Sequence, residues 1–458
     1  MDIDFKKIKE IHFIGIGGIG MSAIAEVLMS RGYKITGSDM RMSPICEKLI
    51  KDGAEIHVPQ SRANIKNPDL IVYTDAISED NEELIAARKS GIQVVDRASV
   101  LGNIMKLYKN SIAITGTHGK TTTTSMLATI FHHTQLKPTI LVGGNLDEIG
   151  GNVLVGDRDL LLCESCEYKG NILKYYPSTA VVLNIDEDHL DYYKSIYEIE
   201  NTFIKFIEKM DENSLLIINA DEANLIKIKN AAKGRVWTFG LHQNADFRAF
   251  DLKFDKAGYP SYKLKYKDQV YEVNLPVMGT HNVLNSLAAI ATSVSVGLTV
   301  EEAVSEISQY KAVHQRLEKL AEINGITVMD DYAHHPTEIM ASLNAVKNAH
   351  YNRVFCVFQP HTYTRTKILL NGFADSFKLA DEVVVVDIYA AREVDKKEVH
   401  SKDLVKAMEE RGIHCHYYPD FEGALSFLED NLRPGDLFIT MGAGDVNTLA
   451  KMYIEKNK

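Results

Sequence analysis

Apolar residues in the first hundred positions fall alternately into short runs and into stretches with a helical period. Short apolar runs predict strands, and apolar residues three or four positions apart predict helices. The predicted strands are Glu10–Ile14, Tyr33–Gly37, Asp69–Thr74 and Ile92–Val95. The predicted helices are Met21–Ser30, Ser43–Lys51 and Glu82–Lys89, and Arg97–Tyr108 closes the region. Repeated strand–helix units of this kind predict a parallel sheet with helices on its faces.

A second series of the same kind begins at Ser111 and ends in a different pattern. Its predicted strands are Ile112–Thr115, Thr139–Val142, Asp159–Cys163, Ala180–Asn184, Leu215–Asn219 and Val236–Phe239. Its predicted helices are Ser125–Phe131, Glu198–Lys209 and Glu222–Lys229. Short alternating segments between Phe247 and Leu275 predict antiparallel hairpins, and two helices follow at Asn282–Val296 and Val300–Gln309.

A third series runs from Gly325 to the end of the chain. Its predicted strands are Ile326–Met329, Arg353–Phe358, Glu382–Asp387, His414–Tyr417 and Asp436–Thr440. Linkers are predicted near Lys106–Asn110 and His314–Arg316. A chain of 458 residues is long enough for about three domains that each bury a core.

The composition narrows the class of protein. With 45% hydrophobic and 25% charged residues, the chain resembles a soluble globular protein. No apolar run approaches the roughly 20 residues of a membrane span, and the first residues lack a signal peptide's apolar segment, so we expect a cytoplasmic protein without a membrane partner. A net charge of −11 argues against nucleic acid as the main partner, and five cysteines imply no disulfide framework.

The segment Gly116–Thr122 reads Gly-Thr-His-Gly-Lys-Thr-Thr and lies between a predicted strand and a predicted helix. Such a turn directs backbone N–H groups and a helix N-terminus at one spot, which suits a polyphosphate. Lys120 would then meet the β- and γ-phosphates, and the Thr121 hydroxyl would face Mg²⁺. The spacing is shorter than in the common phosphate loop, because Ile114 stands where its first glycine is expected. Binding of a nucleoside triphosphate is the working hypothesis.

A second glycine turn, Gly15–Gly20, joins the first predicted strand to its helix, and Asp39 ends the second strand. The turn lets backbone approach a pyrophosphate, and the carboxylate can accept hydrogen bonds from a ribose or base. The same pair of features occurs in dinucleotide-binding proteins. The turn therefore does not distinguish binding of NAD from binding of another nucleoside diphosphate. Its glycines can also serve only the packing of the helix on the strand.

Carboxylates and a histidine follow two strands of the second series. Glu164 and Glu167 come after Asp159–Cys163, and His189 comes after Ala180–Asn184. Near a bound triphosphate such groups suit Mg²⁺, which takes few protein ligands and shares the oxygens of its substrate. Cys163 and Cys166 lack the second pair that a structural zinc site needs, and we expect free thiols.

Further polar clusters open helices later in the chain. His281, Asn282 and Asn285 lie on one face of the first turn of the helix predicted at Asn282–Val296. There they can form hydrogen bonds to an adenine or cap the helix. Arg316 lies in the second predicted linker, where it can either form a salt bridge within the linker or bind the γ-phosphate of ATP. In the third series Asp330–Glu338 and Phe358–Thr366 both join a strand to a helix, which predicts that His335, His361 and Arg365 meet at one sheet edge.

Taken in order, seven motifs resemble the Mur ligases of bacterial cell-wall synthesis. They are IHFIGIGGIGMSAIAEVL followed by GSD, GTHGKTTTT, NIDEDHLDYY, GTHNVLNSLAA, DDYAHHPTEI, FQPHTYTRTK and MGAGDV. The resemblance implies an α/β fold of three domains. These are an N-terminal Rossmann-like UDP-binding domain (1–108), a central P-loop ATPase domain with a mixed sheet (109–314) and a C-terminal Rossmann-like ligase domain (315–458).

The resemblance also implies a role for individual residues, with ATP and Mg²⁺ as cofactors. Phosphates of ATP would be held by Gly116, Thr117, Gly119, Lys120, Thr121, Thr122 and Arg316, and its adenine and ribose by His281, Asn282, Asn285 and Asp331. The implied metal ligands are Thr121, Glu164 and His189. UDP-N-acetylmuramic acid would be held by Gly17, Gly18, Gly20, Ser38, Asp39 and His118, and the amino-acid carboxylate by His361 and Arg365. Some relatives have Arg where Thr362 stands, so one carboxylate contact differs here.

The implied reaction joins L-alanine to the lactyl carboxylate of UDP-N-acetylmuramic acid. The carboxylate takes the γ-phosphoryl group of ATP, and the amine then attacks the acyl phosphate. Lys120, Glu164, His189, His335 and Arg365 would be catalytic, and a general base is expected at His335 or Glu167. The alternatives are a tripeptide ligase of cell-wall recycling, a nicotinamide-dependent dehydrogenase and a nucleotide-sensing ATPase. We expect a monomer or a homodimer with small-molecule partners.

Overall fold

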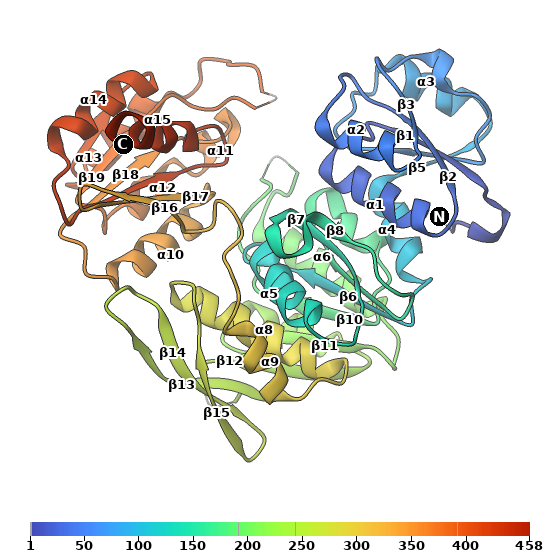
Figure 1. The fold of residues 1–458 in the computed structure, drawn as a ribbon, viewed down its shortest axis with the longest axis horizontal. Helices are drawn as coiled ribbons and strands as arrows, with labels where there is room; N and C mark the ends of the chain where they lie inside the picture. Colours follow the sequence, from blue (N-terminus) through green and yellow to red (C-terminus); the bar gives the residue numbers. More distant parts are fainter. Residues whose placement is uncertain (1, 191, 243, 392) are drawn as a thin grey trace. The chain divides into compact units, whose positions relative to one another are not determined.

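The computed structural model describes residues 2–190, 192–242, 244–391 and 393–458. Its strands form three sheets, and the α/β fold class predicted from the sequence is confirmed (Figure 1). The chain divides into two compact units that are each built from several segments. The first contains Met1–Ile185, Ile199–Thr238 and Ala291–Leu298, and the second contains Asp186–Glu198, Phe239–Ile290 and Thr299–Lys458.

The N-terminal sheet has five parallel strands in the order β3-β2-β1-β4-β5. The strands are β1 (Glu10–Ile14), β2 (Lys34–Ser38), β3 (Glu55–His57), β4 (Leu70–Tyr73) and β5 (Gln93–Asp96). The connecting helices are α1 (Ile19–Ser30), α2 (Pro44–Lys51), α3 (Glu82–Lys89) and α4 (Arg97–Met105), with short 3-10 turns η1 (Phe5–Lys7) and η2 (Arg62–Asn64). Strand order reverses between β1 and β4, which is where such sheets bind ligands beyond the carboxyl ends of their strands.

The central sheet is mixed and has the order β15-β14-β13-β12-β11-β10-β6-β9-β7-β8. Its strands are β6 (Asn110–Thr115), β7 (Thr139–Leu146), β8 (Gly151–Leu154), β9 (Leu160–Glu164), β10 (Thr179–Val182), β11 (Leu215–Asn219), β12 (Arg235–Gly240), β13 (Phe247–Phe254), β14 (Pro260–Tyr266) and β15 (Gln269–Asn274). Its helices are α5 (Lys120–His132), α6 (Ile196–Glu208), α7 (Ile226–Asn230), α8 (Thr280–Ser295) and α9 (Val300–Ile307), with η3 (Asp147–Ile149), η4 (Tyr168–Lys174) and η5 (Ala223–Leu225). The predicted antiparallel hairpins are β13 to β15.

The C-terminal sheet has the order β16-β17-β21-β18-β19-β20, with β16 antiparallel to its neighbour. Its strands are β16 (Glu318–Ile323), β17 (Ile326–Asp331), β18 (Val354–Phe358), β19 (Glu382–Val385), β20 (Cys415–Tyr417) and β21 (Leu437–Met441). Its helices are α10 (Pro336–Lys347), α11 (Tyr363–Ile368), α12 (Leu370–Ser376), α13 (Ser401–Glu409), α14 (Phe421–Asn431) and α15 (Asn447–Asn457). One face of the sheet packs on apolar side chains of α10, α12 and α13, and the other packs on α14 and α15.

The pattern analysis located most of the strands and missed three of those that the structure describes. β3, β8 and β16 were not predicted, and the helix after the phosphate loop begins at Lys120 instead of Ser125. The missed strands are short or rich in polar residues, so they lack a clear apolar pattern. In the described part of the chain no helix is both long and apolar enough to cross a membrane. The predicted domain boundaries remain a prediction.

Candidate active site

The phosphate loop lies between β6 and α5, as the sequence predicted. Gly116 and Gly119 have φ of +135° and +83°, which favour glycine, and Gly119 caps α5 without a side chain. A β-carbon at Gly116 would lie only 3.0 Å from the carbonyl oxygen of Asn184. The loop is therefore shaped by its glycines, and the N-terminus of α5 has no side-chain cap, as is typical of anion-binding helix starts.

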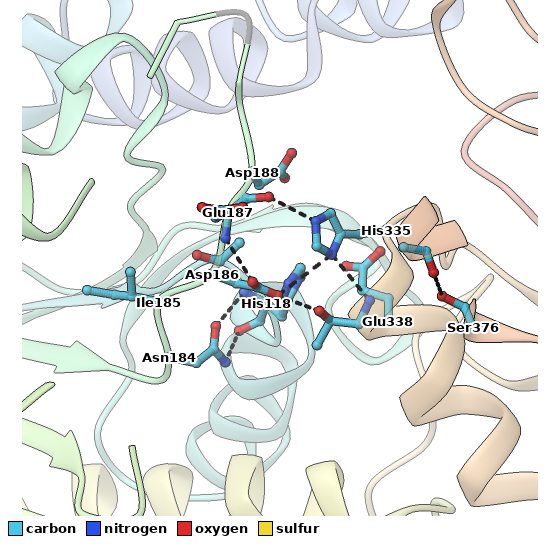
Figure 2. A network of polar contacts seen from close by, with 12 residues as sticks. His118, Asn184, Ile185, Asp186, Glu187, Asp188, His335, Glu338 and Ser376 are labelled. Carbon is cyan, nitrogen blue, oxygen red and sulfur yellow. Dashed lines mark hydrogen bonds and ion pairs between the residues drawn. The ribbon is translucent and has the colours of Figure 1, made fainter. Parts of the chain in front are cut away.

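Asn184 fixes the loop from the end of the neighbouring strand. Its Oδ1 accepts a hydrogen bond from the His118 backbone N–H at 2.8 Å, and its Nδ2 donates to the His118 carbonyl at 3.0 Å (Figure 2). Its own carbonyl accepts from the Thr117 N–H at 3.2 Å. Sequence reasoning assigned no role to Asn184. Its position at a strand end beside an acidic motif was the available signal.

Lys120 and Thr121 point into a carboxylate-lined site. The Lys120 ammonium donates to the carbonyls of Gly116 and Thr117, and lies 3.5 Å from a carboxylate oxygen of the buried Glu167. The Thr121 hydroxyl donates to Glu164 Oε2 at 3.1 Å. The structure thus brings together four residues that the sequence singled out at the ends of two parallel strands.

Glu164 is held from a second side by the backbone of β7. Its Oε1 accepts a hydrogen bond from the Gly143 N–H at 2.6 Å, and a β-carbon at Gly143 would lie 2.7 Å from the same carboxylate. A half-buried carboxylate beside a threonine hydroxyl fits Mg²⁺, which favours oxygen ligands. Gly143 was missed, because its partner is distant in the sequence.

The glycine turn of the N-terminal sheet is also well defined. The N–H groups of Gly15 and Ile16 donate to the Ser38 carbonyl at 2.8 and 3.0 Å. The Gly17 N–H donates to Asp39 Oδ2 at 2.9 Å. The Ser38 side chain is fully buried, which favours a backbone role for this predicted substrate residue. Gly18 caps α1 without a side chain.

In the second unit, His335 lies at the start of α10 and contacts the segment after β10. Its Nδ1 accepts from the Thr337 N–H at 3.3 Å, and its Nε2 donates to the Glu187 carbonyl at 2.9 Å (Figure 2). Both ring nitrogens are therefore engaged, which favours a positioning role over that of a general base. Asp186 lies 3.7 Å from Nδ1.

His361 and Arg365, which both belong to the second of the two strand–helix motifs, contact each other. A guanidinium nitrogen of Arg365 lies 3.2 Å from His361 Nδ1, and the other lies 3.1 Å from Asp188 Oδ1. Burial, together with His334 and Arg365, lowers the pKa of His361 to about 4, so the ring is neutral at physiological pH. Burial alone would raise the pKa of Asp188, but His189 and Arg365 outweigh it and hold that pKa below its usual range.

The predicted adenine and ribose residues lie on elements of the second unit. The buried Asn282 donates to the Met278 carbonyl at 2.7 Å and accepts from Asn285 Nδ2 at 3.0 Å. These two side chains therefore form hydrogen bonds that stabilise the start of α8. Burial lowers the pKa of His281 to about 4. The Arg316 guanidinium lies 5.1 Å from the ring centre of Tyr332. His189 belongs to this unit, with a positive φ of 54°, and its metal role remains a prediction.

Asp331 ends β17 and is 4% exposed. Its carboxylate accepts hydrogen bonds from Ser342 Oγ at 2.6 Å and from the Ala333 N–H at 3.0 Å. Burial raises its pKa from 3.8 to about 6, against the opposing effects of Ser342 and Arg316. The folded chain therefore binds a proton at this site more tightly than the unfolded chain does.

We expect Asp331→Asn to change the pH dependence of stability. A raised folded pKa gives stability below pH 3.8 that is lost as pH rises through 6. The difference between 3.8 and about 6 corresponds to about 3 kcal/mol. Urea unfolding between pH 4 and 7 should show the variant gaining stability relative to the unsubstituted chain as pH rises. Ser342→Ala keeps the carboxylate, so its pH dependence should persist; a pH-independent difference for Asp331→Asn would contradict the prediction.

Three successive segments of the chain match Mur ligase domains. Residues 10–109 match the Mur ligase family catalytic domain, 114–293 the Mur ligase middle domain and 315–444 the Mur ligase glutamate ligase domain. The chain belongs to the Mur ligase family, as its motifs indicated.

Its relatives within this family are similar over their full length. It is 47% identical to the UDP-N-acetylmuramate–L-alanine ligase of Clostridium acetobutylicum over 98% of both chains. It is 43% identical to the enzyme of the same name from Caldanaerobacter subterraneus, over the whole of both. Among solved structures, the UDP-N-acetylmuramate-alanine ligase of Thermotoga maritima superimposes with a TM-score of 0.79 at 29% identity, over 98% of this chain and 99% of that one. A murein peptide ligase of Psychrobacter arcticus shares the fold, with a TM-score of 0.71 at 23% identity over 98% of each.

Proposed function

We propose that this chain joins L-alanine to the lactyl carboxylate of UDP-N-acetylmuramic acid at the expense of ATP. The observation that supports this substrate pair best is the 47% identity to a relative of that name over 98% of both chains. The phosphate loop supports the use of ATP, since Lys120 lies in the first turn of α5 and the N-terminus of that helix has no side-chain cap.

The reaction proceeds in two transfers. A lactyl carboxylate oxygen attacks the γ-phosphorus of ATP, the bond to the bridging oxygen breaks, and ADP leaves. The L-alanine amine then attacks the acyl phosphate, loses a proton and expels phosphate, which leaves an amide. Lys120 offsets the charge of the two anions in the first transfer. Mg²⁺, held by Thr121, Glu164 and His189, would supply further charge neutralisation.

Glu167 is the better supported general base of the two predicted candidates. Its buried carboxylate lies in the phosphate-loop site, 3.5 Å from the Lys120 ammonium. Both nitrogens of His335 are engaged with backbone groups. The neutral His361 and the Arg365 guanidinium, which contact each other, are assigned to the amino-acid carboxylate.

The test is phosphate release and amide formation with ATP, Mg²⁺ and UDP-N-acetylmuramic acid. L-alanine, glycine, L-serine and the recycling tripeptide are supplied in turn, and the product is weighed by mass spectrometry. We expect turnover to require both the sugar nucleotide and L-alanine. Glycine should also react, but more slowly, because its missing methyl group lowers transition-state binding by only about 1–3 kcal/mol. Turnover with the tripeptide alone would assign the chain to recycling, and release indifferent to any acceptor would refute a ligase.

A further inference from the structure

The hairpin of β7 and β8 forms one edge of the central sheet and packs on α1 of the N-terminal sheet. β8 is the last strand in the sheet order, and β7 separates it from β9, which ends in Glu164. All of these elements belong to the first compact unit. The hairpin therefore contacts both the helix that follows the glycine turn and the strand that bears the predicted metal ligand.

On the β8 side the hairpin contacts α1 through Asn152. The side-chain amide of Asn152 donates a hydrogen bond to the Ile19 carbonyl at 3.0 Å, and the same carbonyl accepts from Ser22 Oγ at 3.0 Å. Ile19 is the first residue of α1 and directly follows the N-cap Gly18. The N-terminus of this helix has no side-chain cap and no acidic residue in its first turn. An anion bound there would order the same turn that Asn152 contacts.

On the β7 side the hairpin contacts Glu164 through Gly143. The Gly143 N–H donates to Glu164 Oε1 at 2.6 Å. β7 pairs with β8 before and after residues 142–145 but not within them, and Asn152 is the residue of β8 that stands opposite this stretch. A stretch outside the regular ladder depends on other contacts for its position. Asn152 and Gly143 therefore belong to the same irregular part of the hairpin.

Glu164 connects this irregular stretch to the first turn of α5. Its Oε2 accepts from the Thr121 hydroxyl at 3.1 Å, and a β-carbon at Gly143 would lie 2.7 Å from the same oxygen. The backbone at Gly143 thus limits where the carboxylate can lie. Through one hairpin, the first turn of α1 is joined to the carboxylate that the sequence assigned to Mg²⁺.

We propose that the β7–β8 hairpin couples occupancy of the glycine turn to the position of Glu164, with Asn152 as the positioning residue that joins the two. This inference rests on the proposed function, in which a sugar nucleotide occupies the turn and a nucleotide with its cation binds beside Glu164. A ligand that orders the first turn of α1 also orders Asn152 and the irregular stretch opposite it. The second ligand then loses less conformational entropy on binding, so each ligand tightens the other by the same factor.

The test measures Mn²⁺ binding to the full chain by calorimetry, with an ATP analogue whose β- and γ-phosphorus atoms are joined by a methylene group, so that no transfer occurs. The second ligand is saturating UDP-N-acetylglucosamine, which has the diphosphate and sugar of the substrate but no lactyl carboxylate to contact the cation. We expect it to tighten Mn²⁺ binding by about 10-fold, and Mn²⁺ with the analogue to tighten its binding equally.

Asn152→Leu keeps the size of the side chain and removes the donor. It should reduce the coupling factor to about 3-fold or less and leave Mn²⁺ binding without the sugar nucleotide unchanged, whereas Asn152→Gln should restore part of the factor. The matched control is Asn431→Leu in α14, because the Asn431 amide also donates to a helix carbonyl, that of Phe427 at 2.8 Å. The control should keep the full factor.

Hydrogen exchange gives a readout that needs no metal. UDP-N-acetylglucosamine alone should slow amide exchange over residues 139–154 in the unsubstituted chain and in Asn431→Leu, but not in Asn152→Leu. If Asn152→Leu does not fold, exchange in the unsubstituted chain still decides the question. Slowed hairpin amides support the coupling, and amides that the ligand leaves unchanged overturn it.

Three binding results would each overturn the proposal. A full coupling factor in folded Asn152→Leu would mean that the hairpin does not join the two sites. Tightening by UDP-N-acetylmuramic acid but not by UDP-N-acetylglucosamine would assign the effect to direct contact between the lactyl carboxylate and the cation. No tightening by either would show two independent sites. Failure of the proposed function is separate, because it appears as no amide formed from L-alanine by the unsubstituted chain, whatever the Mn²⁺ affinities.

Discussion

Replacement of Lys120 by methionine is expected to lower kcat by about 10²- to 10³-fold. The ammonium is held over the loop by the carbonyls of Gly116 and Thr117, so it is preorganised where the transferred phosphoryl group gains charge. Methionine has a similar length but no charge and no donor. Lys120→Arg should fail almost as badly, because a planar guanidinium cannot reproduce three contacts around one nitrogen. The measurement is single-turnover formation of ADP with saturating ATP and sugar nucleotide.

The same substitution removes the Lys120 ammonium from beside the buried Glu167 carboxylate. Side-chain exposure there is only 2%, so stability is expected to fall as well. The double variant Lys120→Met with Glu167→Gln should recover the melting temperature without recovering activity, which separates the two effects. Lys109→Met, on the exposed surface before β6, is the matched control. A Lys120→Met chain with half its original kcat would show that the ammonium does not act in phosphoryl transfer.

The phosphate loop and the glycine turn could be predicted because their signals are local. Glycine at 116 and 119 is required by positive φ values, and the strand and helix on either side are visible in the apolar pattern. The start of α5 could not be predicted in the same way. Threonine is a poor helix former, yet the side chains of Thr123 and Thr124 are fully buried, and tertiary packing overrides the local preference.

The contacts that hold the site in place were not predictable, since they join positions that are far apart in the chain. Asn184 reaches His118 across 66 positions, and Gly143 reaches Glu164 across 21. Asn152 shows the same limit: it belongs to β8, which the pattern analysis missed, and it reaches Ile19 across 133 positions. A motif identifies which residues bear the chemistry, whereas the residues that orient them depend on the topology of the sheet.

Replacement of Glu164 by glutamine should raise the Mg²⁺ concentration needed for half-maximal activity by about 10- to 100-fold. The carboxylate accepts from the Thr121 hydroxyl and from the Gly143 N–H, and these two contacts hold it beside the first turn of α5. Glutamine keeps the size and one acceptor oxygen but removes the negative charge that a hard divalent cation requires. Turnover is therefore measured over a Mg²⁺ titration at saturating ATP, with Mn²⁺ as a second metal.

Glu148→Gln is the control that isolates the metal effect from the loss of a threonine–glutamate contact. Glu148 accepts a hydrogen bond from Thr129 in the same helix α5, so the control alters an equivalent pair away from the phosphate loop. Its Mg²⁺ dependence should match that of the unsubstituted chain. An unchanged Mg²⁺ requirement in Glu164→Gln would mean that this carboxylate only secures β7 against the first turn of α5. The charge needed for phosphoryl transfer would then have to come from Lys120 and from the predicted ligands outside β9.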